Sequence, residues 1–577
     1  MPSNLDFRNV NSLWCSVLAE TLHRCGVREA VVAPGSRSTA LTIALARHPG
    51  LEAIPVLDER SAAFFALGLA RQHHRPVVLV CTSGTAAANF FPAVIEARES
   101  GVPLLVITAD RPPEMRECAS GQTIDQQKLY GAYPRWQHEC AVPEASLSLL
   151  SYLRQTVVHA FTRSLSPEAG PVHLNAPFRD PLPPLADGLA EKLENACDWE
   201  RFFDQVSFSP PLENRTSLPS LPATGRGVII AGAAQPQDAA AYAQAVGEIA
   251  RKLGWPVLAD SLSPLRMHAG LNNFLVTTYD TLLRNPLVAE RLKPEAVLCL
   301  EGWPISKVLR AWIHDTDAPV WMVSESDQNR DALHGRTRSW RGSARHLADG
   351  LSGARMGRDY QALWAGYERK VRARLDECLQ ATTGLFEGRA VWLLAQHLPE
   401  KTPVFIANSM PVRDGEYFWP PNDRKLSPRF NRGANGIDGT LSTALGVAHG
   451  GRPAVLLTGD LALLHDTNGF LLRPKFRGSL TVVLINNRGG GIFQHLPVAQ
   501  FDPPFEDYFA TPQEADFGRL CAAYGVEHTK VGDWETLIAL LATLPATGLR
   551  VLEVCTDRKR DAATRKQIFA EVAARLA

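Results

Sequence analysis

Short apolar runs alternate with amphipathic stretches along most of this chain, and the alternation predicts its architecture. Over residues 1–180 it predicts buried strands at 30–33, 77–81 and 104–109, a further strand that runs into residue 56, and helices at 39–47, 60–71 and 85–99. Strands that alternate with helices form parallel sheets covered by helices on both faces. The N-terminal region is therefore expected to be an α/β domain.

The same pattern occurs twice more. A second set of strands is expected at 227–232, 256–260, 296–300 and 320–323, and a third at 404–407, 454–457, 480–485 and 549–554. A polar stretch rich in Pro and Ser separates the first two sets and is typical of a linker. We predict three doubly wound parallel-sheet domains, at 1–185, 223–375 and 376–577, with the linker at 186–222.

The composition is that of an ordinary globular protein. The 577 residues are 45% hydrophobic and 21% charged, and 60 Lys and Arg balance 60 Asp and Glu. This balance argues against a nucleic-acid partner. The ten cysteines have no CxxC spacing, and no apolar run reaches the ~20 residues of a membrane span. We expect a cytoplasmic protein without a signal peptide or stable membrane insertion.

Residues suited to metal binding occur at two predicted strand ends in the C-terminal region. Asp460 follows the strand at 454–457, and Asn487 follows the strand at 480–485, beside a glycine run that includes Gly489. Carboxylate, amide and backbone oxygens suit Mg²⁺ or Mn²⁺, and phosphate oxygens and water fill the remaining positions. These residues predict a metal–diphosphate site, with two unrelated polar turns as the alternative.

The 27-residue spacing from Asp460 to Asn487 resembles the signature of thiamin diphosphate-dependent enzymes, which begins Gly-Asp-Gly and ends Asn-Asn. Leu461 stands where the third position is commonly Gly. The resemblance implies the thiamin diphosphate-enzyme type of α/β fold and gives Glu59 a role at the start of a predicted helix. There it would hydrogen-bond the aminopyrimidine ring of the cofactor and relay a proton. A Glu favoured at a helix start by the macrodipole is the alternative.

Further motifs narrow the resemblance. They are Pro-Gly-Ser-Arg-Ser at 34–38, Ser-Gly-Thr-Ala at 83–86, Thr-Ala-Asp-Arg-Pro-Pro at 108–113 and Asn-Arg-Gly-Ala-Asn-Gly-Ile-Asp-Gly at 431–439. As a set they resemble the menaquinone-pathway synthases that make 2-succinyl-5-enolpyruvyl-6-hydroxy-3-cyclohexene-1-carboxylate. Where that family can carry two adjacent basic residues, this chain has Lys307 followed by Val308, and Arg310 lies one turn further on.

The resemblance implies a transferase that decarboxylates 2-oxoglutarate and adds the four-carbon carbanion to isochorismate. Both substrates carry two carboxylates, which the cationic side chains would bind. The residues implied in substrate binding are Ser36, Arg37, Arg111, Gln122, Lys307, Ser409, Arg413, Arg432 and Leu496. Those implied in catalysis are Glu59, Gln122, Arg37, Ile492 and Phe493. Cofactor contacts are implied for Glu59, Ser409, Asn435, Gly436, Asp460, Asn487, Ile492 and Phe493, and metal contacts for Asp460, Asn487 and Gly489.

Two alternatives stay open. One is another thiamin diphosphate-dependent 2-oxo-acid decarboxylase or acetolactate-type synthase. The other is a non-catalytic relative that binds a dicarboxylate. The middle domain has no GxGxxG motif followed by an acidic residue, so we expect no bound dinucleotide there. The relatives build each active site from two subunits, so the resemblance implies at least a homodimer, and we expect a homotetramer.

Overall fold

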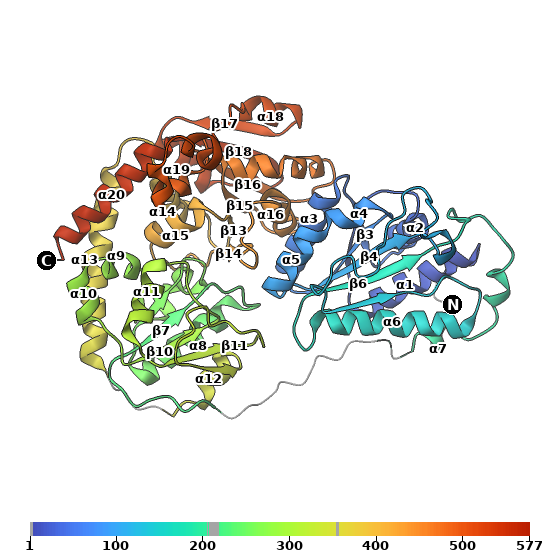
Figure 1. Cartoon of the computed structure of the whole chain (residues 1–577), viewed down its shortest axis with the longest axis horizontal. Helices are drawn as coiled ribbons and strands as arrows, with labels where there is room; N and C mark the ends of the chain where they lie inside the picture. Colours follow the sequence, from blue (N-terminus) through green and yellow to red (C-terminus); the bar gives the residue numbers. More distant parts are fainter. Residues whose placement is uncertain (1–3, 205, 207–217, 353–356, 577) are drawn as a thin grey trace. The chain divides into compact units, whose positions relative to one another are not determined.

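Three separate sheets form the framework of the described part of the chain (Figure 1), and each has six strands there. The structure is a computed structural model that describes residues 4–204, 206, 218–352 and 357–576. Every strand pair in the three sheets is parallel. The predicted fold class of three doubly wound parallel-sheet domains is confirmed.

Contacts along the chain define two units. Unit 1 comprises Met1–Leu212, Asn431–Gly450 and His465–Arg477, and unit 2 comprises Glu213–Phe430, Gly451–Leu464 and Gly478–Ala577. Unit 1 therefore contains the first sheet together with two short segments from late in the sequence. Unit 2 contains the other two sheets.

The sheet of unit 1 has the strand order β2-β1-β3-β4-β6-β5. Its strands are β1 Glu29–Val32, β2 Glu52–Pro55, β3 Val77–Cys81, β4 Leu104–Asp110, β5 Trp136–Glu139 and β6 Pro171–Pro177. The helices of this unit are α1 Val10–Cys25, α2 Thr39–Arg47, α3 Glu59–His73, α4 Thr85–Asn89, α5 Phe91–Ser100, α6 Leu147–Leu165, α7 Trp199–Phe202 and α16 Thr440–Ala448. Short 3₁₀ turns lie at Pro113–Met115, Glu191–Leu193 and Thr467–Leu472.

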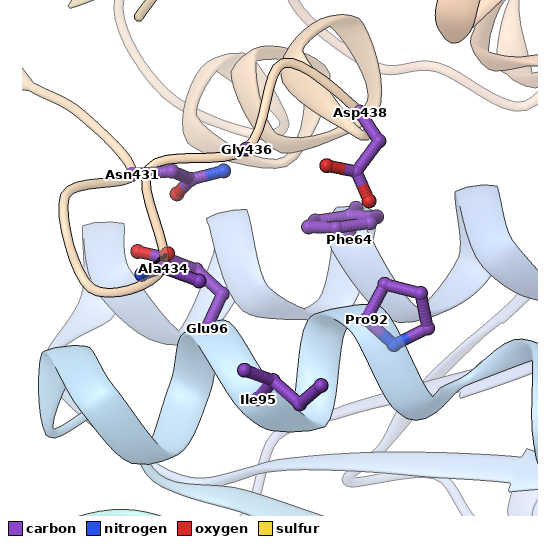
Figure 2. Close-up of a pocket in the computed structure, with 8 residues that line it drawn as sticks. All are labelled: Phe64, Pro92, Ile95, Glu96, Asn431, Ala434, Gly436 and Asp438. Carbon is purple, nitrogen blue, oxygen red and sulfur yellow. Dashed lines mark hydrogen bonds between the residues drawn. The ribbon is translucent and has the colours of Figure 1, made fainter.

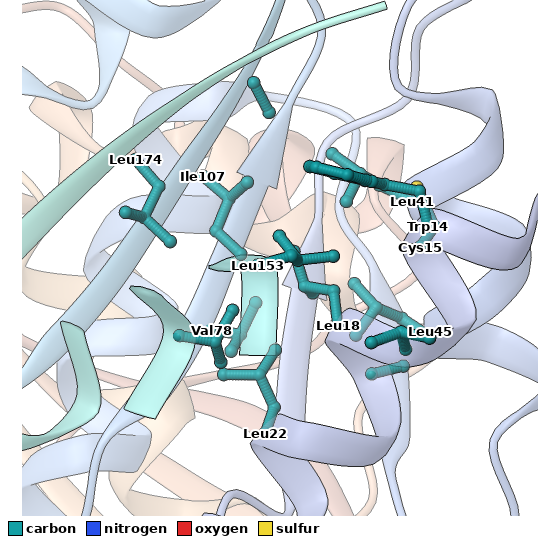
Figure 3. Packing of buried hydrophobic residues seen from close by; sticks show 14 of the residues in the cluster. Trp14, Cys15, Leu18, Leu22, Leu41, Leu45, Val78, Ile107, Leu153 and Leu174 are labelled. Carbon is teal, nitrogen blue, oxygen red and sulfur yellow. The ribbon is translucent and has the colours of Figure 1, made fainter. Parts of the chain in front are cut away.

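Apolar side chains from α1, α2 and α6 form the core on one face of this sheet (Figure 3). Trp14 and Leu18 of α1 belong to the same buried cluster as Leu41 of α2, Leu153 of α6 and Ile107 of β4. Burial of this apolar surface is the main stabilising contribution to such a domain. This packing holds the helices against the sheet. The loops at the carboxyl ends of the strands lie outside the core and can carry polar groups.

The helix predicted at 85–99 is interrupted, because α4 ends at Asn89 and α5 begins at Phe91 with Pro92 as its second residue. Proline has no N–H donor, so it starts a helix more readily than it continues one. The strand expected to run into residue 56 is β2, whereas the prediction missed β5 and β6. Strand β5 is an edge strand with polar side chains, and β6 carries His173 and Asn175 within a fully buried strand.

Helix α16 packs closely on α3, the helix that begins at Glu59. A Cβ atom placed on Gly68 of α3 would lie 2.1 Å from the carbonyl oxygen of Thr443 and 2.9 Å from Cα of Gly446. Only glycine permits backbones to approach this closely. Every residue of α16 is buried.

Unit 2 holds two sheets, with the orders β12-β11-β10-β7-β8-β9 and β14-β13-β15-β16-β18-β17. The first contains β7 Gly227–Ala231, β8 Val257–Ala259, β9 Leu275–Val276, β10 Ala296–Leu300, β11 Val320–Ser324 and β12 Thr337–Arg341. The second contains β13 Pro403–Ile406, β14 Ser427–Arg429, β15 Ala454–Gly459, β16 Ser479–Asn486, β17 Glu527–Val531 and β18 Gly548–Cys555. The short edge strands β9, β12, β14 and β17 were not predicted.

The α-helices of unit 2 are α8 Ala239–Leu253, α9 Tyr279–Leu283, α10 Pro286–Arg291, α11 Lys307–Thr316, α12 Ala344–Gly350, α13 Arg358–Ala381, α14 Glu387–His397, α15 Met410–Phe418, α17 Asp460–His465, α18 Phe517–Ala523, α19 Trp534–Ala542 and α20 Arg558–Ala574. Shorter turns lie at Pro264–Met267, Ala269–Leu271, Gly491–His495, Pro497–Gln500 and Glu506–Ala510. None of the helices in the described part of the chain is both long enough and apolar enough to cross a membrane.

Two of the predicted domain boundaries fall within ordered structure. Trp199 and Phe203, from the segment predicted as a linker, are buried in the core of unit 1, whereas residues 205 and 207–217 lie outside the described residues. Helix α13 runs across the predicted boundary at 375/376. The domain boundaries stay predictions.

Candidate active site

Glu59 is held at the start of α3 by polar contacts on both sides of it. Asp58 caps the helix by accepting a hydrogen bond from the Ser61 N–H at 2.9 Å, and its second oxygen accepts one from Asn468 Nδ2 at 2.8 Å. Arg60 donates to the carbonyl oxygen of His465 at 2.6 Å. These contacts fix the backbone that carries the Glu59 carboxylate.

The Glu59 carboxylate lies near the end of β3. Burial and, to a smaller extent, the charge of Glu59 raise the pKa of the Cys81 thiol well above its usual value. Cys81 is the last residue of β3, so Glu59 faces the carboxyl edge of the sheet. Ligands of open α/β sheets bind at this edge.

Three of the predicted substrate-binding residues meet at the turn that follows β3. Gln122 Nε2 donates to the carbonyl oxygen of Ser83 at 2.9 Å, and Arg111 donates to the Ser83 hydroxyl. Arg37 is buried, and its backbone N–H donates to Thr82 Oγ1 at 3.3 Å. Unit 1 thus brings Arg37, Arg111 and Gln122 to one turn.

The guanidinium of Arg37 is only partly satisfied. Its Nη1 donates to the Phe178 carbonyl at 2.9 Å, and Asp180 lies 3.6 Å away, but its buried Nε has no hydrogen-bond partner among the described residues. Burial lowers the pKa of Arg37, and the nearby charge of Arg111 lowers it further. Two neighbouring cations with spare donor capacity can bind a carboxylate. Ser36, on the same loop, is exposed.

The motif at 431–439 lies in unit 1, where it is anchored by a buried carboxylate. Glu96 of α5 accepts hydrogen bonds from the N–H groups of Gly433 at 3.0 Å and Ala434 at 2.7 Å. Its side chain also pairs with the buried Arg71 at 3.2 Å. Gly436 lines a cavity of about 160 Å³ between this loop and helices α3 and α5 (Figure 2). Of the other predicted residues of the motif, Asn435 is exposed and Arg432 is half-buried.

In unit 2, Asp460 and Asn487 leave neighbouring parallel strands at the carboxyl edge of the sheet. Gly459 of β15 pairs in register with Ile485 of β16, so both side chains emerge just beyond the pairing. The carboxylate of Asp460 accepts hydrogen bonds from the N–H of Gly489 and that of Leu461, each at 2.8 Å. The strand ends therefore bring the three predicted metal-site residues together.

The chemistry of this donor set fits a hard divalent cation. Asn487 is 6% exposed, and its Oδ1 has no hydrogen-bond partner among the described residues. Burial raises the pKa of Asp460 to about 6, and the groups that oppose this rise are backbone N–H donors rather than cations. A bound metal ion would stabilise the charged carboxylate and satisfy the amide oxygen.

A single carboxylate among neutral oxygen donors would leave coordination positions of a bound metal ion open for phosphate oxygens. In the described ranges 4–204, 206, 218–352 and 357–576, no group of three or more His, Cys, Asp or Glu side chains is arranged to hold a metal ion. Gly489 has a φ of 120°, and a Cβ atom there would lie 2.3 Å from the Ala510 carbonyl. The backbone beside Asn487 thus takes a path that requires glycine.

A second group of cations lies in unit 2 and includes Arg413 of α15. Arg413 donates through Nη1 to the Ser409 carbonyl at 2.6 Å. Burial lowers the pKa of Arg413, and the charge of Arg310 lowers it further, so these two side chains lie near each other. Lys307 is exposed at the first position of α11, and Val308 packs against the apolar core of the middle domain. Arg310 is therefore the second cation near Arg413.

The predicted apolar wall follows the glycine run. Ile492 and Phe493 lie in the turn Gly491–His495 and are half-buried, and Leu496 is 36% exposed. The ring of Phe493 packs edge-on against that of Phe509, with 5.9 Å between centroids. The wall is thus continuous with the segment that carries Asn487.

Comparison with known proteins agrees with this arrangement. Three families match consecutive parts of the chain: "Thiamine pyrophosphate enzyme, N-terminal TPP binding domain" at 15–129, "Middle domain of thiamine pyrophosphate" at 205–406, and "Thiamine pyrophosphate enzyme, C-terminal TPP binding domain" at 417–554. The 2-succinyl-5-enolpyruvyl-6-hydroxy-3-cyclohexene-1-carboxylate synthase of Gloeothece citriformis is 55% identical over 97% of each chain. The synthase of the same name from Microcystis aeruginosa is 55% identical over 96% of this chain and 98% of its own. This chain belongs to that family of synthases.

Membership in the synthase family confirms the resemblance drawn from the motifs. A third synthase, from a Nostoc species, is 52% identical over 98% of this chain and 99% of its own. The three matched domains correspond to the three sheets and support thiamin diphosphate as the cofactor. The roles of individual residues stay predictions.

The sequence patterns missed a buried charged network that contacts Asn487 of the predicted metal site. Helix α20, which lies beyond the last matched domain, contributes Asp561 and Arg565 to it. Asp414 of α15 and Glu387 of α14 also belong to it. Burial, with the charge of Glu387 adding to it, raises the pKa of Asp561 to about 7. The signal in the sequence was weak: these two positions in α20 share a helical face with the apolar Ile568 and Val572.

Proposed function

We propose that this chain decarboxylates 2-oxoglutarate and adds the four-carbon fragment to isochorismate. The products are 2-succinyl-5-enolpyruvyl-6-hydroxy-3-cyclohexene-1-carboxylate and CO₂, in menaquinone biosynthesis. The observation that carries the proposal is the full-length similarity to synthases named for this product. Two groups of partly buried cations, one in each unit, suit substrates that both carry two carboxylates.

The cofactor would be held by the residues at the sheet edges. Asp460 and Asn487, with the backbone of Gly489, would bind Mg²⁺ or Mn²⁺ and through it the diphosphate. Thiamin diphosphate, when bound, supplies the carbanion chemistry that the side chains lack. Glu59 would accept and return a proton at the aminopyrimidine ring, a task that suits a carboxylate fixed at a helix start.

The substrate would be held by cations and closed off by apolar side chains. Arg37 and Arg111, with Gln122, would bind one carboxylate beside the Ser83 turn. Arg413 would bind another carboxylate, with Arg310 adding positive charge in place of Val308. The remaining substrate-side residues in this proposal are Ser36, Lys307, Ser409, Arg432, Ile492, Phe493 and Leu496. The apolar members would exclude water from the reacting atoms.

The same proposal covers enzyme class and assembly. The reaction makes the protein a transferase of the transketolase class, acting in the cytoplasm. We propose a homodimer as the smallest active form and a homotetramer as the assembled one. Sedimentation of the purified protein with cofactor and metal tests this assembly, and an active monomer would exclude it.

Mass spectrometry of the products tests the reaction. With 2-oxoglutarate, isochorismate, thiamin diphosphate and Mg²⁺, we expect the succinyl adduct, and omission of either cofactor or metal should abolish it. Turnover of pyruvate without use of isochorismate would favour an acetolactate-type enzyme instead. Binding of dicarboxylate without any turnover would favour a non-catalytic relative.

Substitution of Glu59 tests its role within that reaction. We expect Glu59→Gln to lose decarboxylation while metal-dependent cofactor binding largely survives, because the amide cannot take up the proton. Glu144→Gln, at an exposed position, is the matched control and should retain full activity. Unchanged turnover in Glu59→Gln would exclude the role.

A further inference from the structure

The amide of Asn487 is held in one orientation by a buried carboxylate. Its Nδ2 donates to Glu387 Oε2 at 3.0 Å, and its Oδ1 has no partner in the described part of the chain. Both residues are buried, Glu387 being 3% exposed. An ionised carboxylate only accepts hydrogen bonds, so the nitrogen of the amide must face Glu387 and the oxygen must face away.

Glu387 is held in turn by a guanidinium from the last helix. Arg565, which is 2% exposed, donates through Nη2 to Glu387 Oε1 at 2.7 Å. The same guanidinium donates to Asp414 Oδ1 through Nε at 3.0 Å and through Nη2 at 2.7 Å. Its Nη1 lies 2.9 Å from His495 Nε2, which must accept because a guanidinium has no acceptor.

These contacts connect three segments that carry predicted site residues. Asn487 follows β16, Asp414 is the neighbour of Arg413 in α15, and His495 closes the turn that holds Phe493. Arg565 is anchored by multiple hydrogen bonds, so it has little freedom to reorient. Removal of one member of a buried ion pair would leave the other charge uncompensated, which is strongly destabilising.

We propose that Glu387 and Arg565 are positioning residues that determine which end of the Asn487 amide is presented to the metal. The inference rests on the proposed metal and cofactor site. The two ends of an amide have nearly the same shape, so packing alone would permit a rotated side chain. A rotated amide would present an NH₂ group, which cannot ligate a cation. The hydrogen bond to Glu387 removes that possibility.

An exchange of the two polar groups tests the proposal. In Glu387→Gln, the new amide oxygen accepts from Arg565, so its NH₂ faces Asn487 and turns that amide round. In Asn487→Asp, two carboxylates face each other. The double variant restores every hydrogen bond with reversed polarity, because the new glutamine donates to the new aspartate and still accepts from Arg565. The double variant also has the same total charge as the wild type.

Calorimetric titration of Mg²⁺ in the presence of thiamin diphosphate is the readout. We expect Glu387→Gln to raise the Kd by roughly 10- to 100-fold, the usual effect of removing a partner of a metal ligand. The double variant should return to within about threefold of the wild type, because all of these hydrogen bonds are present again. Glu400→Gln, an exposed change in the same part of the chain, should bind as the wild type does.

The outcomes separate this inference from the proposed function. A wild type that fails to bind Mg²⁺ with thiamin diphosphate overturns the metal site and the inference together. A wild type that binds, with Glu387→Gln binding equally well, overturns the inference alone. So does a folded double variant that binds Mg²⁺ as weakly as Glu387→Gln does.

A further variant covers the case in which the exchanged proteins do not fold. Arg565→Lys keeps the charge but loses the fork that reaches Glu387 and Asp414 together. We expect it to weaken Mg²⁺ binding about tenfold, whereas Arg560→Lys, an exposed change on the same helix, should have no effect. Unchanged Mg²⁺ binding in Arg565→Lys would overturn the inference.

Discussion

The packing of α16 on α3 predicts that a single methyl group at Gly446 will disable the enzyme without unfolding it. A Cβ atom at this position would lie 2.2 Å from the Phe65 carbonyl oxygen and 2.9 Å from Cα of Gly68. Both obstacles are backbone atoms of a buried helix, so neither can rotate away. Helix α3 begins at Glu59, and any displacement of α3 therefore moves the predicted catalytic carboxylate.

The size of the displacement follows from the distances. An ordinary contact begins at 3.4 Å, so Gly446→Ala requires the two helices to separate by about 1.2 Å. Overpacking of this kind costs about 1–3 kcal/mol, and the better helix propensity of alanine returns up to about 1 kcal/mol. A displacement of about 1 Å at a catalytic group can lower the rate by ~100-fold. We therefore expect a modest loss of stability and a large loss of kcat.

Steady-state kinetics and thermal unfolding of the same preparation measure the two effects. Gly366→Ala is the matched control, because it lies within helix α13 and nothing lies within 4 Å of its added methyl group. The control should keep full activity and gain up to about 1 kcal/mol in stability. Wild-type kcat in Gly446→Ala would refute the argument that the helix contact positions Glu59.

Two further predictions concern the substrate cations and a buried histidine. Arg413→Ala and Arg310→Ala should each raise the KM for a dicarboxylate substrate by roughly 10- to 100-fold, because a charge-assisted contact is lost, while cofactor affinity stays unchanged. Kinetics with each substrate varied will show this, and equal losses of substrate and cofactor affinity would contradict it. Burial lowers the pKa of His173 to about 4 from 6.5, so its stabilising contribution is complete above pH 6.5 and is lost as the pH falls towards 4. Urea unfolding should show that the wild type loses about 2 kcal/mol more than His173→Gln between pH 7 and pH 5, and equal losses would exclude the effect.

The central strands, and the meeting of Asp460 and Asn487 at one sheet edge, could be predicted because both depend on short-range patterns. A continuous apolar run such as the one at 77–81 reports burial on both faces of a parallel sheet. The end of such a run marks the edge where ligands bind, which is why Asp460 and Asn487 could be assigned together. Most edge strands escaped prediction because strands such as β5 are only half-buried and carry polar side chains.

The charged network around Asn487 could not be predicted in the same way. The hydrogen bond between Asn487 and Glu387 joins residues 100 positions apart in the sequence. The hydrogen bond between Arg565 and Glu387 joins residues 178 positions apart. A charged residue in a helix is usually a solvated one, and no local pattern distinguishes the buried exception. Arg565 is buried because α20 packs against α13, α9 and the turn after Asn487.

By itself, the sequence determined the class of fold and the family, and it supplied the side chains that we predict to bind and react. It does so because strand and helix periods, turn residues and motif spacings act over a few residues and are written locally. Apart from Asp460 and Asn487, the tertiary structure alone decided which of those side chains meet. It placed Arg310 beside Arg413 and anchored the loop at 431–439 on Glu96. It also oriented the amide of Asn487 so that its nitrogen faces Glu387 and its oxygen faces away. Such pairings depend on the packing of distant elements, whose geometry no local pattern specifies.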